Sequence, residues 1–131
     1  MGKSLTQKII ESHYVSGSMV PGEEVFIHVD QALTHDINAV MTYLAFEAVG
    51  LPRVRTECSV SYLDHNLLYV NNMTPDDHIY LQSVAKKYGV YVSRPGNGIC
   101  HTVHVARFGA PGKVSMGGDS HTPHGGAIGM L

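Results

Sequence analysis

Residues 116–126, with the sequence MGGDSHTPHGG, present a carboxylate, a hydroxyl and an imidazole (Asp119, Ser120 and His121) between two pairs of glycines. The run at 113–116 before them is apolar and predicts a short strand. Glycine lacks a Cβ, so the backbone can turn sharply there and come close to a ligand. Open α/β sheets hold their binding sites on loops that leave strand ends in this way. The same residue types are also ordinary turn formers, so composition alone is equally compatible with a plain turn.

The sequence before this stretch alternates between helical and strand patterns. Strands are predicted at 24–29, 58–62, 90–92 and 114–116, and helices at 5–13, 35–49 (capped by Thr34), 75–88 (capped by Thr74) and 99–108. The apolar face of the 35–49 helix, expected to pack on a sheet, consists of Val40, Met41, Leu44, Ala45, Ala48 and Val49. Strands that alternate with helices predict an α/β fold, a three-layer αβα sandwich with a largely parallel sheet, in one domain spanning 1–131.

Composition narrows the function classes. The 131 residues carry a net charge of −2 with no basic block, which argues against binding to nucleic acid, including RNA, or to a membrane surface. The amino terminus has no long apolar run, so neither a signal peptide nor a membrane span is expected, and a cytoplasmic location is predicted. The two cysteines, Cys58 and Cys100, lie far apart in the sequence and are expected to be reduced.

Three blocks of sequence, in the same order, resemble the aconitase superfamily, which includes aconitase, homoaconitase and the large subunit of 3-isopropylmalate dehydratase. The blocks are GDSHTP at 118–123 with GGAIG at 125–129, DHN at 64–66, and RPGNGICH at 94–101. A weaker fourth match is the His-Asp pair at 35–36. The resemblance runs from about Val25 onward and implies the amino-terminal domain of a larger protein, with further domains or a second subunit as partners.

The resemblance implies reversible removal and re-addition of water on a tri- or dicarboxylate. Hydroxide is a poor leaving group, so it must be protonated or held by a Lewis acid. In the family this Lewis acid is the open iron of a [4Fe-4S] cluster. The cysteines that hold the cluster lie downstream of the matching region in the family, so no metal ligand is expected within this chain, and the isolated chain is expected to be inert.

The same resemblance implies roles for the histidines and acids of the blocks. His65, paired with Asp64, would protonate the departing hydroxyl. His101 and Asp119 would form a second pair, and His121 would contact the iron-bound water or hydroxyl. An imidazole beside a carboxylate suits proton transfer, because the acid favours the charged ring. Neighbouring residues in a sequence cannot always bond to each other, so which acid supports which imidazole stays open here.

Two further residues would hold the substrate. Ser120 would donate a hydrogen bond to a substrate carboxylate, and His35 would grip another one. Mitochondrial-type aconitases carry glutamine at the position of His35, so histidine favours the bacterial aconitase, homoaconitase or isopropylmalate branches. The RPGNGICH block favours an aconitase-like member.

Other interpretations compete with the enzyme. The chain could be a non-catalytic module that binds a carboxylate or a metal; the His-x-x-His spacing of His121 and His124 suits zinc but lacks a third ligand. A domain of a larger protein also exposes surface meant for its neighbours, so self-association is plausible. The remaining histidines carry no motif and are interpreted as surface or structural residues: His13, His28, His78, His104 and His124.

Overall fold

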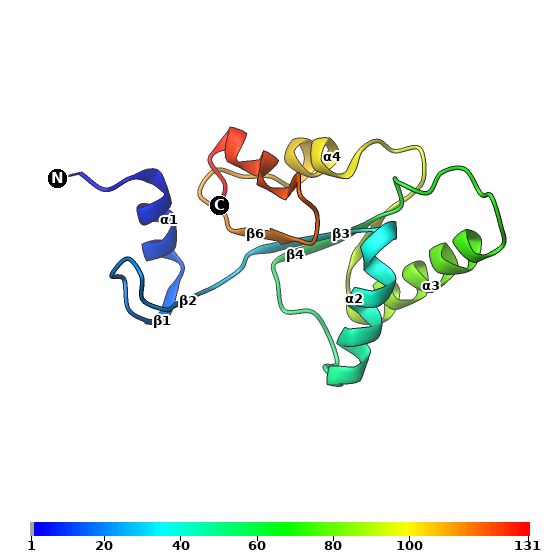
Figure 1. The fold of residues 1–131 in the computed structure, drawn as a ribbon, viewed down its shortest axis with the longest axis horizontal. Helices are drawn as coiled ribbons and strands as arrows, with labels where there is room; N and C mark the ends of the chain where they lie inside the picture. Colours follow the sequence, from blue (N-terminus) through cyan, green and yellow to red (C-terminus); the bar gives the residue numbers. More distant parts are fainter. Residues whose placement is uncertain (1) are drawn as a thin grey trace.

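Four parallel strands form the centre of the molecule, in the order β5-β4-β3-β6. The computed structural model describes residues 2–131 and gives the strands as β3 (Gln31–His35), β4 (Cys58–Tyr62), β5 (Tyr91–Ser93) and β6 (Ser115–Gly117). Figure 1 shows helices α2 (Asp36–Val49) and α3 (Met73–Tyr88) on one side of this sheet. Helix α4 (Cys100–Arg107) and the 3-10 helix η1 (Thr122–Ile128) cover the other side. The predicted α/β class, with three layers and a parallel sheet, is confirmed.

Side chains alternate across the sheet, so each face has its own core. Leu33, Val60 and Tyr62 point toward α4 and pack with the buried Cys100. On the other side, α2 and α3 pack together around Tyr43 and the fully buried Leu81. The sheet is therefore held from both faces, and its strand ends are fixed in position.

The predicted helices and the four predicted strands are found within one or two residues of their expected bounds. Gly50 and Gly89 end α2 and α3 in the left-handed conformation. After the last strand, Thr122–Ile128 form the 3-10 helix η1. The last strand is Ser115–Gly117 and not 114–116.

Strand β3, in the middle of the sheet, was not predicted. The strand expected at 24–29 is β2 (Val25–Ile27), which pairs antiparallel with β1 (Tyr14–Gly17) outside the central sheet. Strand β3 carries polar residues, and its polar ends have buried partners: the Gln31 amide donates to Phe108 O (2.8 Å) and accepts from His104 Nε2 (3.0 Å). A polar pattern of this kind does not indicate a central strand. His35 is accordingly the last residue of β3 and the N-cap of α2, not the first residue of a helix.

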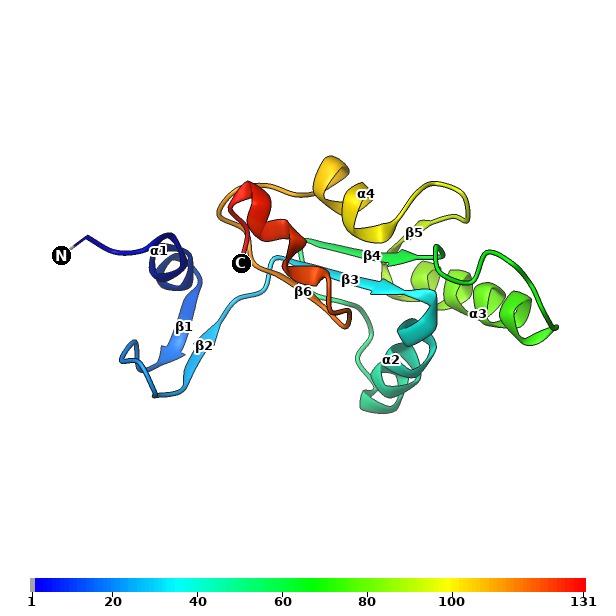
Figure 2. The ribbon, with the colours of Figure 1, turned by 45° about the horizontal axis from the view of Figure 1, so that its top comes forward.

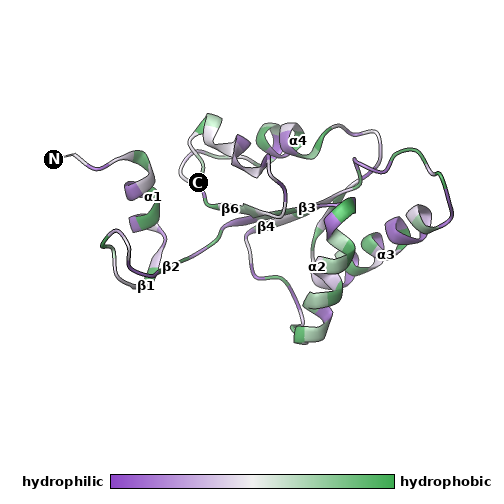
Figure 3. Ribbon diagram, viewed as in Figure 1, coloured by the Kyte–Doolittle hydropathy of each residue, from purple (hydrophilic) through white to green (hydrophobic). Residues whose placement is uncertain are grey.

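The predicted packing face of α2 was wrong except at Val40, which packs against the core. Met41 and Val49 are 72% and 69% exposed, and Leu44 is 48% exposed, whereas Ala39 and Tyr43 are buried. Figure 3 colours α2 hydrophobic along most of its length. The helix therefore has more apolar surface than its contacts with α3 and the sheet can bury. When a helix is apolar nearly all round, the periodicity of its sequence cannot select the buried side.

A small amino-terminal unit lies beside the end of the sheet (Figure 2). It consists of α1 (Leu5–Ser12), β1 and β2. The buried carboxylate of Asp30 connects this unit to the segment before β6. It accepts from His13 Nε2 (2.7 Å) and from the backbone N–H of Val114 (2.8 Å). Among the described residues, no helix has the length and apolar character needed to cross a membrane.

Candidate functional site

The carboxyl ends of β3, β4 and β6 and the start of α4 meet at one edge of the sheet. An open cleft of about 540 Å³ lies there, lined by Asp64, His65, Ile99, His101, Thr102, His121 and His124. Side chains from three separate sequence blocks therefore share a single cleft. The sequence predicted four of them as site residues: Asp64, His65, His101 and His121.

Asp64 and His65 are adjacent in the sequence and bond to each other. His65 Nδ1 lies 3.0 Å from Asp64 Oδ1, and the other carboxylate oxygen accepts from the backbone N–H of Cys100 at 2.6 Å. Because an ionised carboxylate only accepts, the His65 proton sits on Nδ1, and Nε2 has no hydrogen-bond partner among the described residues. The Asp64 carboxylate is thereby fixed to α4, and the imidazole is fixed to the carboxylate.

Asp119 joins the second group of histidines. Its Oδ1 accepts from His101 Nε2 (2.6 Å) and from the backbone N–H of His121 (2.8 Å), and its Oδ2 lies 3.4 Å from His35 Nε2. The bond from the His121 N–H, followed by the bond and charge of His101, lowers the pKa of Asp119 to about 2. Asp119 is therefore an anion at neutral pH, and the predicted His101–Asp119 pairing is present in the structure.

The low pKa of Asp119 predicts a region of acid instability. A carboxyl group whose pKa is depressed in the folded state contributes stability above its unfolded pKa, and that contribution is lost as the pH falls through the folded value. For Asp119 the window runs from the ordinary pKa of about 4 down to about 2. A carboxyl NMR titration should place the Asp119 midpoint near 2, and Asp119→Asn should lose less stability across this window than the wild type. An Asp119 midpoint near 4 would contradict the hydrogen bonds described above.

His35 lies behind the cleft and does not line it. Its side chain is 5% exposed, and its ring stacks on that of His65, with centroids 4.2 Å apart. The Asn38 amide accepts from the His35 backbone N–H (3.2 Å) and donates to His35 Nε2 (3.0 Å). Burial, and then the charge of His65, lowers the pKa of His35. His35 is thus neutral and stacks behind His65; its role as a carboxylate ligand stays a prediction.

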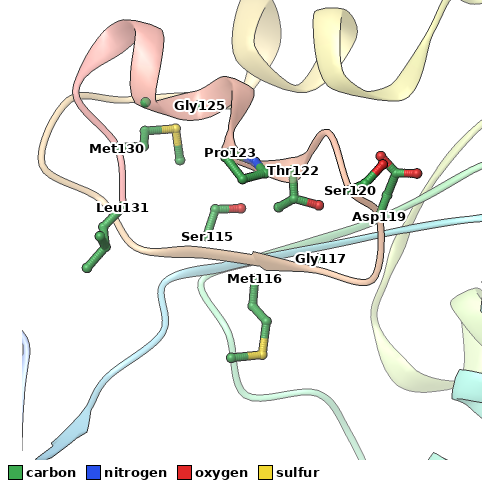
Figure 4. A pocket seen from close by; sticks show the side chains of 11 residues that line it. Ser115, Met116, Gly117, Asp119, Ser120, Thr122, Pro123, Gly125, Met130 and Leu131 are labelled. Atoms are coloured by element: carbon green, nitrogen blue, oxygen red, sulfur yellow. The ribbon is translucent and has the colours of Figure 1, made fainter. Parts of the chain in front are cut away.

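Ser120 is exposed, and its Oγ lies 3.3 Å from His121 Nδ1. With Asp119 it lines a second hollow of about 600 Å³ along β6. Figure 4 shows this hollow on the η1 side of the strand, with Ser115 and Thr122 inside it and Met116 on the opposite side. Ser120 does not line the histidine cleft, so its predicted contact with a substrate carboxylate also stays a prediction.

The glycines around this loop differ in how closely they are packed. A Cβ on Gly117 would stand 2.6 Å from Thr122 Oγ1 and 3.0 Å from Leu33 Cγ, whereas a Cβ on Gly126 would meet nothing within 4 Å. Gly117→Ala should therefore lower the free energy of unfolding by about 1–3 kcal/mol through overpacking. Gly126→Ala is the matched control and should change it by less than about 0.5 kcal/mol. Equal melting temperatures for the two variants would show that β6 and η1 are not packed as described.

Three overlapping groups of side chains place ligand atoms within 4.8 Å of one another: His35, His65 and Asp119; Asp64, His65 and Cys100; and His101, Asp119 and His121. The cysteines do not suit an iron–sulfur cluster, which is held by several thiolates. Burial, and then the charge of Asp64, raises the pKa of the Cys100 thiol to about 12, and burial also raises the pKa of Cys58. The residues present therefore do not fit a [4Fe-4S] cluster.

Sequence reasoning missed some residues of the site and interpreted others correctly. His124 lines the cleft, although its only sequence signal was the His-x-x-His spacing. Asp36, part of the weak fourth match, has a nearly inaccessible carboxylate that accepts from the backbone of His65. The structural interpretation of His78 and His104 is confirmed, because both are buried and both ring nitrogens of each have partners.

Comparison with known proteins agrees with the geometry. The model of the aconitase family (aconitate hydratase) matches residues 7–131. A probable mitochondrial aconitate hydratase of Dictyostelium discoideum is 28% identical over 98% of the chain and 18% of its own length. The mitochondrial homocitrate dehydratase of Saccharomyces cerevisiae is 29% identical over 98% and 19%. The 3-isopropylmalate dehydratase large subunit of Elusimicrobium minutum is 29% identical over 100% and 31%.

The chain thus spans less than a third of the length of these relatives. The family match covers nearly all of the residues described, including every strand of the central sheet and every residue of the cleft. The chain belongs to the aconitase family.

Proposed function

We propose that this chain is the acid–base domain of an aconitase-type hydro-lyase, which reversibly dehydrates and rehydrates a hydroxy-carboxylate such as citrate or isocitrate. The observation that carries the proposal is the shared cleft, in which His65 and His101 are each paired with a carboxylate. The relatives include dehydratases that act on other acids, homocitrate and 3-isopropylmalate, so those substrates are the alternatives.

His65 is the residue that protonates the departing hydroxyl. Asp64 holds the proton on Nδ1 and stabilises positive charge on the ring, which leaves Nε2 to carry a second proton and release it to the substrate oxygen. The stacked, neutral His35 restrains the ring from behind. After release, His65 remains neutral, with its Nδ1–H still bonded to Asp64, and can take a proton from the water that re-adds.

His121 supplies a donor to the cleft, beside His101. His101 is held by Asp119 through Nε2, while the His121 side chain is 80% exposed and free to turn toward a bound ligand. Imidazole N–H groups of this kind suit the carboxylates of the substrate. Asp119, an anion at neutral pH, holds both residues through its Oδ1.

The cluster that the family resemblance implies would supply a Lewis acid for the hydroxyl, and it would be held by residues outside those described. We accordingly expect the remaining domains or a second subunit of the enzyme to complete the site, and the isolated chain to be inert. A cytoplasmic location stays a proposal, since several relatives are named as mitochondrial.

NMR titration of the chain with citrate, isocitrate and 3-isopropylmalate tests the function. We expect one of these acids to shift the imidazole signals of His65, His101 and His121 together, while the exposed His28 outside the cleft stays unchanged. Shifts confined to residues outside the cleft, or none with any of the three acids, would refute the assignment. Turnover by the isolated chain would refute the need for other domains.

A second candidate function is binding of a divalent metal. It is favoured by the group of His101 Nε2, Asp119 Oδ1 and His121 Nδ1, whose N···O separations of 2.6 and 3.4 Å bracket the spacing of neighbouring ligands around zinc. Cobalt(II) titration followed by visible absorption should give a tetrahedral spectrum if the site binds metal. His121→Asn should abolish this spectrum and His28→Asn should retain it; absence of the spectrum from the wild type would remove this candidate.

A further inference from the structure

Asp36 is a buried carboxylate at the first position of α2, directly behind the histidine cleft. Its side chain is 1% exposed. Every hydrogen-bond partner it has among the described residues is an N–H group: Oδ1 accepts from the backbone of His65 (3.1 Å), and Oδ2 accepts from the backbone of Asn66 (2.9 Å) and from His78 Nε2 (3.0 Å). The N-terminus of α2 adds a favourable field for a negative charge.

These bonds determine where His65 stands. The two backbone groups belong to the loop after β4, which leaves the sheet at the point where the Asp64–His65 pair forms. Asp64 holds the start of this loop through the backbone N–H of Cys100, whereas Leu68 and Val70 further along it are each 86% exposed. Asp36 also stands 3.9 Å from His65 Nδ1, on the same side as Asp64.

Asp36 is in turn held by His78 from α3. His78 is 3% exposed, and its Nδ1 lies 3.1 Å from the Tyr69 hydroxyl. Since a carboxylate only accepts, His78 Nε2 carries a proton and donates it to Asp36, and the Tyr69 hydroxyl is the partner of Nδ1. These hydrogen bonds join the exposed loop, α3 and α2 in one chain from Tyr69 through His78 to Asp36.

We propose that Asp36, anchored by His78, is the positioning residue for His65: it fixes the backbone of the catalytic loop so that Nδ1 faces Asp64 and Nε2 faces the cleft. Its value in catalysis rests on the proposed function, but the positioning is a property of the fold. Asp36 touches no reacting atom.

Asp36→Asn tests the proposal, because an amide cannot accept at both ends. In either orientation of the amide, its NH2 group would face the backbone N–H of His65 or that of Asn66. We expect amide hydrogen exchange at these two residues to accelerate about tenfold or more. We also expect the imidazole nitrogen spectrum of His65 to change from a fixed Nδ1–H tautomer to a mixture. Asp76→Asn, an exposed acid in the first turn of α3, is the matched control and should change neither measurement.

His78 supplies a second, independent pair of variants. His78→Gln places an amide N–H where Nε2 stands and should retain slow exchange and the fixed tautomer, whereas His78→Phe should lose both. If Asp36→Asn does not fold, this pair decides the question alone. An unchanged His65 tautomer in both Asp36→Asn and His78→Phe would overturn the proposal.

Both measurements are made on the chain without turnover, so failure of the proposed function would leave them intact. In the complete enzyme, a positioning role further predicts that Asp36→Asn and His78→Phe lower kcat with little change in KM. His78→Gln should retain kcat. A raised KM with unchanged kcat in Asp36→Asn would assign Asp36 to substrate binding instead.

Discussion

His65→Asn in a complete enzyme built on this domain should lower kcat about 100- to 10,000-fold, the usual contribution of a positioned general acid. The asparagine amide nitrogen stands close to the place of Nδ1, so it can keep the bond to Asp64 that is 3.0 Å long in the structure. It has no titratable nitrogen at the place of Nε2. The variant therefore removes the proton donor while leaving the backbone, and the Asp64 bond to α4, undisturbed.

The measurement is steady-state kinetics with citrate and isocitrate in both directions, at matched cluster content. His124→Asn is the matched control, because His124 lines the same cleft but has no carboxylate partner among the described residues. It should retain kcat within about threefold. A raised KM with unchanged kcat in His65→Asn would show that His65 binds substrate and does not transfer the proton.

The residues of the cleft could be found from the sequence because they occur in short blocks that resemble a known family. The pairing of acids with imidazoles could not. Asp64 and His65 are neighbours along the chain, and whether they bond depends on the turn after β4, which Cys100 N and Asp36 hold in place. His101 and Asp119 are 18 residues apart and meet only because α4 packs over β3 and β4, beside the loop that follows β6. Pairing is therefore a property of the assembled sheet edge.

Buried polar partners also explain the other differences between the predicted and the observed structure. Asp36 and His78 are 42 residues apart, and the sequence around each of them gives no sign that the two side chains are in contact. Strand β3 looks polar because Gln31 and His35 lie at its two ends, where Gln31 bonds to Phe108 and His104 and His35 bonds to Asn38 of α2. A sequence shows which side chains are polar, but it does not show which of them will find a buried partner. This is why the central strand was missed while strand β4, with its aromatic and β-branched residues, was found.

The apolar residues of α2 raise a similar difficulty, because the sequence does not show which of them will be buried. The helix carries apolar residues on nearly all sides, and the sequence assigned Leu44 to the packed face, yet Leu44 is 48% exposed while Leu81 of α3 is fully buried. Burial of an apolar side chain stabilises a fold only where neighbouring atoms surround it. The two leucines lie on adjacent, packed helices and differ mainly in this respect.

Leu81→Ala should therefore lower the free energy of unfolding by about 2–5 kcal/mol, through lost burial and the cavity left between α2 and α3. Leu44→Ala, the matched control, should change it by less than about 0.5 kcal/mol, since its side chain is half in solvent and alanine favours a helix. Chemical denaturation of both variants, followed by far-ultraviolet circular dichroism, measures the difference. Comparable losses in the two variants would mean that something covers Leu44 in solution, and a dependence of the Leu44→Ala effect on protein concentration would identify that cover as a second copy of the chain.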